Sequence, residues 1–276
     1  MNSKMKDIKL IAIDLDDTLL HDDLTISMRA KEAIKKVIAK GVTVTLATGR
    51  MFAAALPYAR ELGLNVPLIT YQGAMVKCVN GELIYHQTIP LDTAQEVADY
   101  VRFRGYHLNV YVDDKLFMEQ NSPEARHYVT ITRVSPHYVE SFDKLWADPT
   151  KLVVLGEDSK IKSLAIELGQ RFGQSLNIIS PLPCILEITH KKATKSNALK
   201  ALAQSLGFGL ENVMAIGDSP NDLEMVRDAG FGVAMENSIP VLKENADYIT
   251  LSNNDDGVAE VLEKIVLNTQ KVCQTP

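Results

Sequence analysis

The stretch IAIDLDDTLL (11–20) places three carboxylates within four positions, directly after an apolar run. Asp14 and Asp16 are two residues apart at the carboxyl end of a predicted strand, where residues i and i+2 point to the same side. In an open parallel sheet, ligands bind beyond the carboxyl ends of the strands. Two carboxylates at such a place repel one another unless a cation or a shared proton intervenes. The stretch therefore predicts a cation site at a sheet edge, with an ordinary Asp-rich turn as the alternative.

Three further stretches end predicted strands or begin a predicted helix with polar residues: ATGR (47–50), KKATKSNAL (191–199) and GDSPND (217–222). A hard cation such as Mg²⁺ prefers oxygen ligands and often binds together with phosphate. A phosphate group binds amide, hydroxyl and ammonium donors. The stretches offer both kinds of group on one edge of the sheet, through Thr48, Gly49, Arg50, Lys191, Lys192, Lys195, Asp218, Asn221 and Asp222. Together they predict a magnesium–phosphate site.

Each stretch taken alone has an ordinary structural interpretation. Thr-Gly-Arg can begin a helix, and Lys191 and Lys192 are typical of solvated surface charges. GDSPND can be a capping turn with Pro220 at the first helical position. Lys195 is different, because a cation in the first turn of a helix is electrostatically unfavourable. The combination of the four stretches, in sheet order, is more specific than any one of them.

Alternating strands and helices must position these residues. Apolar or β-branched runs predict strands at 10–13, 42–48, 67–71, 213–217 and 230–235. Helices are expected after the caps Ser27 and Thr194, up to Gly63, over 221–228 and from Asp255 onward. This alternation predicts an α/β fold, a doubly wound, Rossmann-like parallel sheet with helices on both faces.

The middle of the chain has a different pattern. Short strands are predicted at 107–112, 116–119, 152–155 and 184–188, with helices near 92–104 and 160–171. The sequence DDK (113–115) predicts a hairpin turn. We expect an α+β insertion at 85–189 between the two halves, 1–84 and 190–276, of one α/β domain.

DLDDT (14–18), ATGR, Lys195 and GDSPND resemble the four motifs of the haloacid dehalogenase superfamily of phosphatases. The insertion, with GVAMEN (232–237) after the fourth motif, resembles the Cof-type subgroup, in which a large α/β cap domain selects the substrate. The resemblance covers nearly the whole chain. It implies a Mg²⁺-dependent enzyme that forms an aspartyl phosphate.

The resemblance also implies roles for individual residues. Asp14 would be the nucleophile, and Asp16 the general acid for the leaving group and then the base for water. The metal ligands would come from Asp14, the backbone carbonyl of Asp16, Asp218 and Asp222, where Asp222 supports the metal shell or orients Lys195. Phosphate and substrate contacts would come from Leu15, Thr48, Gly49, Arg50, Lys195 and Asn221. A carboxylate can attack phosphorus only if both negative charges are offset, here by Mg²⁺ and Lys195.

Two positions depart from the family's usual pattern. Gln72 stands where Asn is frequent after the third strand, and Glu236 stands where Gly is frequent. Gln72 carries the same amide on a longer arm, and Glu236 adds negative charge near the edge of the site. Both changes could narrow or shift the range of substrates.

We therefore expect a phosphatase for a small phosphorylated metabolite, with a sugar phosphate as the first candidate. Phosphates of flavin precursors, pyridoxal or nucleotides, or a mutase reaction of the same superfamily, are alternatives. A receiver-type signalling module also phosphorylates an Asp on a parallel sheet, but it is far shorter and needs no insertion. A binding protein without activity is a third interpretation, against which the intact motifs argue.

Composition limits the other function classes. The chain has 276 residues, of which 46% are hydrophobic and 23% charged, and a net charge of −6. The acidic balance argues against nucleic-acid binding, which needs a basic face. Cys78, Cys184 and Cys273 form no CxxC pair, which predicts free thiols. Without a recognisable signal peptide or apolar span, we expect a cytoplasmic monomer or homodimer with no membrane partner.

Overall fold

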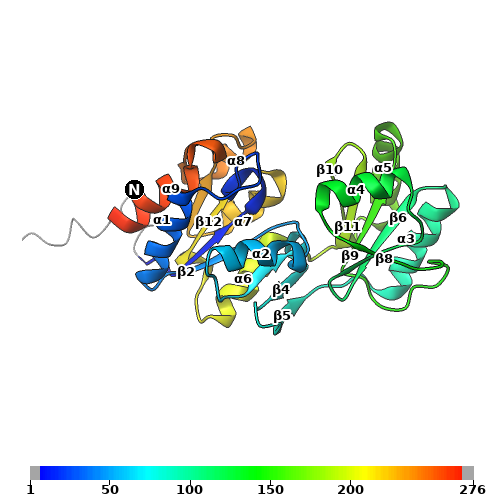
Figure 1. Cartoon of the computed structure of the whole chain (residues 1–276), viewed down its shortest axis with the longest axis horizontal. Coiled ribbons are helices and arrows are strands. Elements are labelled where there is room, and N and C mark those ends of the chain that lie inside the picture. Colours follow the sequence, from blue (N-terminus) through cyan, green and yellow to red (C-terminus); the bar gives the residue numbers. More distant parts are fainter. Residues whose placement is uncertain (1–6, 269–276) are drawn as a thin grey trace, which may run out of the picture. The chain divides into compact units, whose positions relative to one another are not determined.

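The computed structural model describes residues 7–268, and Cys273 lies outside them. The described chain divides into two compact units. Residues 7–50, 55–85 and 194–268 form what we call the core unit, and residues 51–54 and 86–193 form the inserted unit, drawn mainly in green in Figure 1. Each unit is described by itself below.

The core unit contains a five-stranded parallel sheet with the order β14-β13-β12-β1-β2. The strands are β1 (Leu10–Ile13), β2 (Thr43–Leu46), β12 (Val213–Gly217), β13 (Phe231–Ala234) and β14 (Tyr248–Ile249). Every residue of β1, β12 and β13 is buried, which explains why these strands are continuous apolar runs. The predicted α/β class with a parallel sheet is confirmed.

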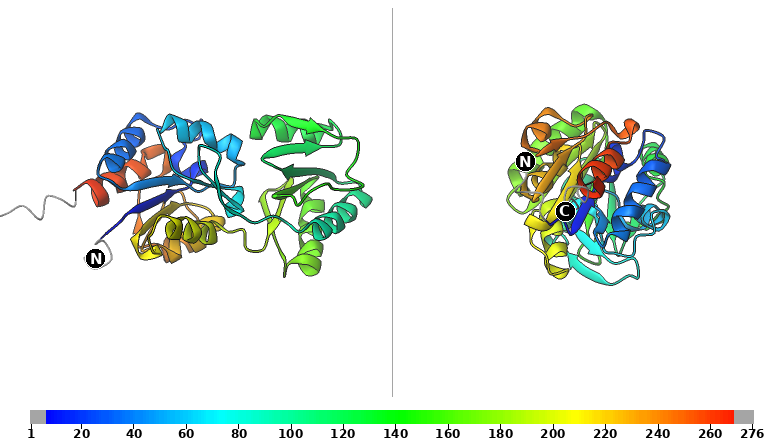
Figure 2. Two further views of the ribbon diagram at one scale, coloured as in Figure 1. Left: turned by 90° about the horizontal axis from the view of Figure 1, so that it is seen from below. Right: turned by 90° about the vertical axis from the view of Figure 1, so that its left-hand side faces the viewer.

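Helices cover both faces of this sheet (Figure 2). They are α1 (Met28–Ala39), α2 (Phe52–Glu61), α6 (Lys195–Ser205), α7 (Leu223–Asp228), α8 (Pro240–Asn245) and α9 (Gly257–Val261), and a π-helical turn continues α9 over Leu262–Leu267. Leu199 and Leu202 of α6 pack on Leu10 and Val213 of the sheet. The caps were predicted correctly, since the Ser27 side chain accepts from Ala30 N and that of Thr194 from Asn197 N.

The third predicted strand has the expected parallel direction but pairs mainly with an antiparallel partner. β3 (Leu68–Thr70) joins the parallel sheet only through an isolated bridge between Ala47 and Ile69. It instead pairs antiparallel with β4 (Met75–Lys77) in a three-stranded sheet completed by β5 (Leu83–His86). The cause is the tight turn Tyr71–Gly73, which reverses the chain immediately after β3.

The inserted unit is built on a six-stranded sheet with the order β10-β11-β9-β6-β7-β8. Its strands are β6 (His107–Val112), β7 (Lys115–Met118), β8 (Pro136–Tyr138), β9 (Lys151–Leu155), β10 (Leu176–Leu182) and β11 (Ile185–His190). Asp113 and Asp114 have φ of 51° and 57°, as the tight β6–β7 hairpin requires. The predicted hairpin is thus present.

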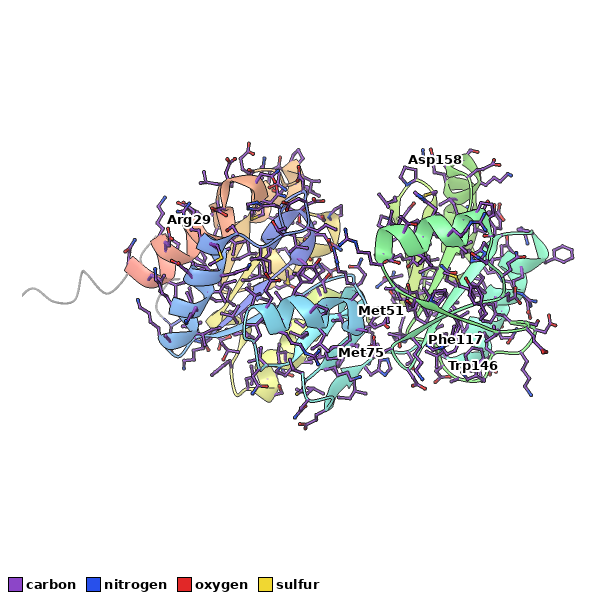
Figure 3. The ribbon with its side chains drawn as sticks, viewed as in Figure 1. Arg29, Met51, Met75, Phe117, Trp146 and Asp158 are labelled. Atoms are coloured by element: carbon purple, nitrogen blue, oxygen red, sulfur yellow. The ribbon has the colours of Figure 1, made fainter. Side chains whose placement is uncertain are left out.

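Helices α3 (Leu91–Phe103) and α5 (Asp158–Phe172) pack their apolar residues on one face of the six-stranded sheet. A third helix, α4 (Pro123–Thr132), was not predicted. Phe117 and Trp146 meet edge to face, with ring centroids 4.8 Å apart, and both are labelled in Figure 3. Across residues 7–268, the structure holds no helix with the length and apolar character that crossing a membrane requires.

Candidate active site

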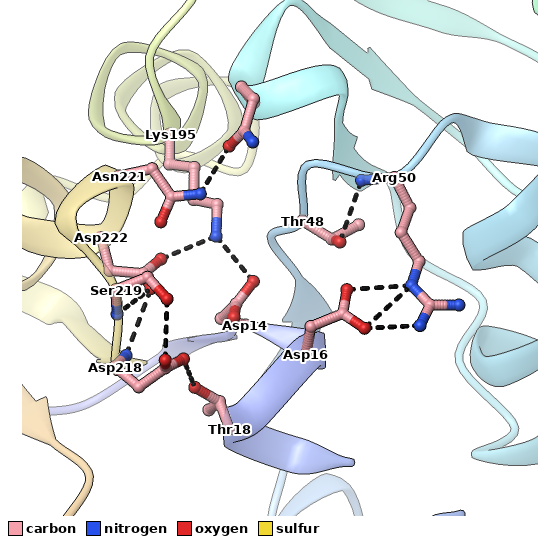
Figure 4. Close-up of polar contacts among 11 residues, drawn as sticks. Asp14, Asp16, Thr18, Thr48, Arg50, Lys195, Asp218, Ser219, Asn221 and Asp222 are labelled. Atoms are coloured by element: carbon pink, nitrogen blue, oxygen red, sulfur yellow. Dashed lines mark hydrogen bonds and ion pairs between the residues drawn. The ribbon is translucent and has the colours of Figure 1, made fainter. Parts of the chain in front are cut away.

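Three neighbouring strands of the core sheet end at the predicted site. Asp14 follows the last residue of β1, Asp218 follows the last residue of β12, and Thr48 lies two residues after β2. Because β12, β1 and β2 are adjacent and parallel, their carboxyl ends share one edge of the sheet. Figure 4 shows the side chains that meet at this edge.

Lys195, the first residue of α6, lies between two carboxylates. Its Nζ donates to Asp14 Oδ1 at 2.6 Å and to Asp222 Oδ1 at 2.7 Å, and its side chain is only 1% exposed. Burial alone would lower the pKa of Lys195, but the two carboxylates raise it, so the ammonium stays charged. This ion pair accounts for a cation in the first turn of a helix, because the local carboxylates outweigh the helix dipole.

The same edge carries more negative charge than Lys195 can balance. One carboxylate oxygen from each of Asp14, Asp218 and Asp222 lies within 4.8 Å of the others. Burial raises the pKa of Asp14 well above its usual range, and the neighbouring carboxylates add to that rise. Burial likewise raises the pKa of Asp218. Three carboxylates facing one ammonium fit a hard divalent cation with oxygen ligands.

The contacts of the three carboxylates differ. Asp218 accepts from Thr18 Oγ1 at 2.6 Å and from Ser219 Oγ at 2.7 Å, which orients both of its oxygens. Asp222 uses Oδ1 for Lys195 and Oδ2 for the backbone N–H groups of Asp218 and Ser219, at 3.2 and 3.1 Å. Asp14 and Asp218 are therefore the better candidates for direct metal ligands, and Asp222 is well placed to orient Lys195.

Asp16 does not share the surroundings of Asp14. β1 ends at Ile13, and the chain then forms the turn Leu15–Leu19, in which Asp17 has φ of 57°. The expectation that Asp14 and Asp16 point to one side of a strand is therefore wrong, since neither belongs to the strand. The Asp16 carboxylate faces Arg50 instead, with Arg50 Nε 2.9 Å from Oδ2. The backbone carbonyl of Asp16, and not its carboxylate, is the expected metal ligand. The contact with Arg50 therefore leaves that expectation unchanged.

The loop after β2 contributes donors beside this ion pair. Thr48 is fully buried, and its Oγ1 accepts from Arg50 N at 3.1 Å. A Cβ at Gly49 would lie 2.3 Å from Gln72 Nε2, so the Gln72 amide lies directly against this glycine. The guanidinium of Arg50 also lies 5.2 Å from the ring centroid of Tyr58. Leu15 is buried in the turn after β1.

Asn221 precedes Asp222 in the short turn Pro220–Asp222. Its Nδ2 donates to Gln72 Oε1 at 2.7 Å, and its Oδ1 is buried without a partner among the described residues. By contrast, Lys191 and Lys192 are exposed, as expected of surface charges. The structure thus joins Lys195 directly to Asp14 and Asp222 and places an Asp218 carboxylate oxygen within 4.8 Å of theirs. It pairs Asp16 with Arg50 and joins Asn221 to Gln72.

Thr18 and Ser219 were not singled out from the sequence, although both orient Asp218. A signal existed, because each hydroxyl lies within a stretch already selected for its acids, DLDDT or GDSPND. Thr18 is 200 positions from Asp218 in the chain, so only the adjacency of β1 and β12 brings the two together.

Comparisons with known proteins agree with this architecture. The haloacid dehalogenase-like hydrolase family profile matches residues 11–262. The 5-amino-6-(5-phospho-D-ribitylamino)uracil phosphatase YcsE of Bacillus subtilis is 35% identical over 95% of this chain and 97% of its own length. The phosphatase of the same name YwtE, also from Bacillus subtilis, is 30% identical over 94% of this chain and 98% of its own.

Solved structures give the same picture. A haloacid dehalogenase-like hydrolase from Bacteroides thetaiotaomicron superposes with a TM-score of 0.87 at 29% identity and covers 94% of this chain and all of that one. A protein from Thermotoga maritima superposes with a TM-score of 0.86 at 32% identity, covering 93% of this chain and 97% of that one.

Proposed function

Because the chain belongs to the haloacid dehalogenase-like hydrolase family and is a phosphatase, we propose that it hydrolyses a small phosphate monoester through a phosphorylated Asp14, with Mg²⁺ bound. The observation that supports this proposal most directly is the buried group of Asp14, Lys195, Asp218 and Asp222 at the edge of the sheet. Such a group offers a nucleophilic carboxylate, a fixed ammonium and an excess of oxygen ligands.

In the first step, a carboxylate oxygen of Asp14 forms a bond to phosphorus while the bond from phosphorus to the leaving oxygen breaks. Asp16 supplies the proton that this oxygen needs. In the second step, Asp16 takes a proton from water, the water oxygen bonds to phosphorus, and the bond to Asp14 breaks. The products are an alcohol and inorganic phosphate. Asp14 returns to its carboxylate form and Asp16 to the protonated form in which it began.

The remaining residues hold charge and position. Lys195 keeps the Asp14 carboxylate oriented and offsets its charge and that of the phosphoryl oxygens. Thr48, the backbone at Gly49 and the Asn221 amide provide donors for those oxygens. A bound Mg²⁺, held by Asp14, Asp218 and the Asp16 carbonyl with Asp222 in support, would supply further charge neutralisation. Positioning of this kind carries most of the catalysis in phosphoryl transfer.

A sugar phosphate is our first substrate candidate. A second is the flavin precursor 5-amino-6-(5-phospho-D-ribitylamino)uracil, which is favoured by the names of the two Bacillus subtilis relatives. The two candidates share a phosphate ester on a polyhydroxylated chain. We assign the choice between them to the inserted unit, as a substrate-selecting cap.

The test is phosphate release from pentose and hexose phosphates, the flavin precursor, pyridoxal phosphate and nucleotides, with Mg²⁺ or with EDTA. Wild type should release phosphate only with Mg²⁺, and Asp14→Asn should be inactive. Asp7→Asn is the matched control, since Asp7 is exposed and precedes β1 at the opposite end of the strand. Release that persists in Asp14→Asn would contradict the assignment of the nucleophile.

A further inference from the structure

The turn between β3 and β4 has an unusual backbone. Tyr71, Gln72 and Gly73 have φ of 54°, 59° and 92°, so three successive residues are left-handed. Glycine adopts this conformation freely, but Tyr and Gln do so only at a cost in free energy. Non-glycine residues in this region cluster where the surrounding structure needs them there.

The backbone of this turn contacts two loops of the active site. Tyr71 N donates to Arg50 O at 2.9 Å and Gln72 N donates to Thr48 O at 3.1 Å, which ties the turn to the loop after β2. On the other side, a Cβ at Gly73 would lie 2.2 Å from Thr194 O. The turn therefore packs directly against the residue that precedes Lys195.

The Gln72 side chain extends this junction to a third loop. It is only 7% exposed, and its Oε1 accepts from Asn221 Nδ2 at 2.7 Å. Its amide also lies against Gly49, where it occupies the space of a Cβ. One residue thus contacts the loop after β2 through its backbone and its amide, and the loop after β12 through a hydrogen bond.

The hydrogen bond fixes the orientation of the Asn221 amide. One of the two Nδ2 hydrogens is used by Gln72, and the amide cannot turn over without losing that bond. Asn221 Oδ1 remains buried and unpartnered among residues 7–268. Buried amide oxygens almost always have a donor, which an ordered water or a substrate hydroxyl can bring here. The second Nδ2 hydrogen of Asn221 can be donated to a phosphoryl oxygen.

We propose that Gln72 is a positioning residue, which holds the Asn221 amide and the Gly49 loop in register for the phosphoryl group. The inference rests on the proposed phosphatase function and deepens it. Gln72 does not touch the reacting atoms; it acts through Asn221 and through the backbone of the loop after β2. The longer arm of Gln at this position is what spans the distance to the loop after β12.

The test is a double-mutant cycle between Gln72→Met and Asn221→Ala. The probe is inorganic phosphate, whose affinity is measured by calorimetry with Mg²⁺ present, alongside KM and kcat. Each single variant should weaken phosphate binding about fivefold, as loss of one hydrogen bond predicts. The double variant should also be weakened about fivefold, whereas independent residues would give about 25-fold. Gln204→Met, an exposed Gln on α6, is the matched control.

A second variant guards against misfolding. Gln72→Asn keeps an amide and suits the left-handed backbone, but its arm is one methylene shorter. It should lose the coupling to Asn221 while its thermal unfolding stays close to that of wild type. The role of Gln72 is overturned if Gln72→Asn keeps its coupling to Asn221. It is also overturned if the effects of Gln72→Met and Asn221→Ala on phosphate affinity are additive.

The outcomes separate this inference from the proposed function. Wild type that releases phosphate, together with an additive cycle, overturns only the role of Gln72. Wild type that neither releases nor binds phosphate overturns the proposed function, and with it the use of this contact in catalysis. The inference is supported if phosphate binding is weakened equally in the two single variants and in the double variant.

Discussion

The guanidinium of Arg50 donates to both carboxylate oxygens of Asp16, with Nη2 2.5 Å from Oδ1 and Nε 2.9 Å from Oδ2. Asp14, two residues earlier, contacts Lys195 in a buried setting, whereas the Asp16 side chain is 46% exposed. Neighbouring carboxylates in such different surroundings can serve as nucleophile and as acid or base. The ion pair with Arg50 therefore sets where the Asp16 carboxylate lies.

The first prediction concerns this ion pair. Arg50→Ala should lower kcat about 10- to 100-fold, because Asp16 loses the partner that positions it and a placed acid contributes about 10²- to 10⁴-fold. Unfolding in urea should change by less than about 1 kcal/mol, since a half-exposed ion pair contributes little. The kcat of Arg50→Lys should lie between those of wild type and Arg50→Ala, because a lysine cannot contact both carboxylate oxygens as arginine does. Wild-type kcat in a folded Arg50→Ala would refute this role.

The second prediction concerns Lys195. Lys195→Met leaves Asp14 and Asp222 buried without their ammonium, which should reduce the free energy of unfolding by about 3–5 kcal/mol at pH 8 in EDTA. Lys200→Met, an exposed lysine on the same helix, should change it by less than about 0.5 kcal/mol.

The pH dependence of the Lys195→Met variant has a definite sign. Burial already raises the pKa of Asp14, and removing Lys195 raises it further. The folded state then binds a proton at pH values where the unfolded state does not, so stability falls as pH rises. The loss should accordingly be smaller at pH 5 than at pH 8 in urea titrations. A larger loss at pH 5 would contradict the assignment of a buried, unpaired carboxylate.

The third prediction concerns the metal ligands. At 100 times its dissociation constant, Mg²⁺ should stabilise the wild type by about 2.7 kcal/mol against unfolding. Asp218→Asn should lose most of this increment, because it removes one of the three negative charges while keeping the acceptor for Thr18. Asp7→Asn should keep it. Thermal unfolding with and without Mg²⁺ gives the comparison, and an unchanged increment in Asp218→Asn would exclude this residue as a ligand.

Much of the fold could be predicted because its strongest signals are local. β1 and β12 are apolar runs buried on both faces, and Ser27 and Thr194 are hydrogen-bonding caps. β3 was predicted as a strand and runs parallel to the segment after β2, but its antiparallel partner β4 was not predicted, because hydrophobic periodicity does not reveal the left-handed turn at Tyr71–Gly73 that reverses the chain. β10 was missed because most of its residues are exposed or half-buried, so it has no clear apolar pattern.

The site was predictable as a set of residues, and much less so as a set of contacts. Asp14 and Asp218 each follow a predicted parallel strand, and this position alone indicated that they share one edge of the sheet. The observed strand order brings them together there. The partners of each side chain depend on loop conformation. Neither the Arg50–Asp16 pair nor the Gln72–Asn221 bond follows from spacing, because the residues of each pair lie on different loops.

The fourth prediction concerns His107, a buried residue at the start of β6 in the inserted unit. Its Nε2 lies 2.9 Å from Asn109 Oδ1, and its Nδ1 lies 3.2 Å from the hydroxyl of Ser122, which caps α4. Either orientation of the Asn109 amide matches one neutral tautomer of the ring, and the Ser122 hydroxyl can donate to Nδ1 or accept from it. The neutral ring therefore fits both contacts, and burial lowers the pKa of His107.

The sign of the resulting pH effect follows from proton linkage. In the unfolded chain His107 takes up a proton below about pH 6.5, whereas in the folded chain it does so only at lower pH. Stability should therefore fall as pH decreases through this window. His107→Gln should flatten the profile between pH 7.5 and 5.5 by about 1 kcal/mol in urea titrations, and His127→Gln, at an exposed position on α4, should leave it unchanged. An equally steep profile in His107→Gln would mean that other groups carry the acid sensitivity of the inserted unit.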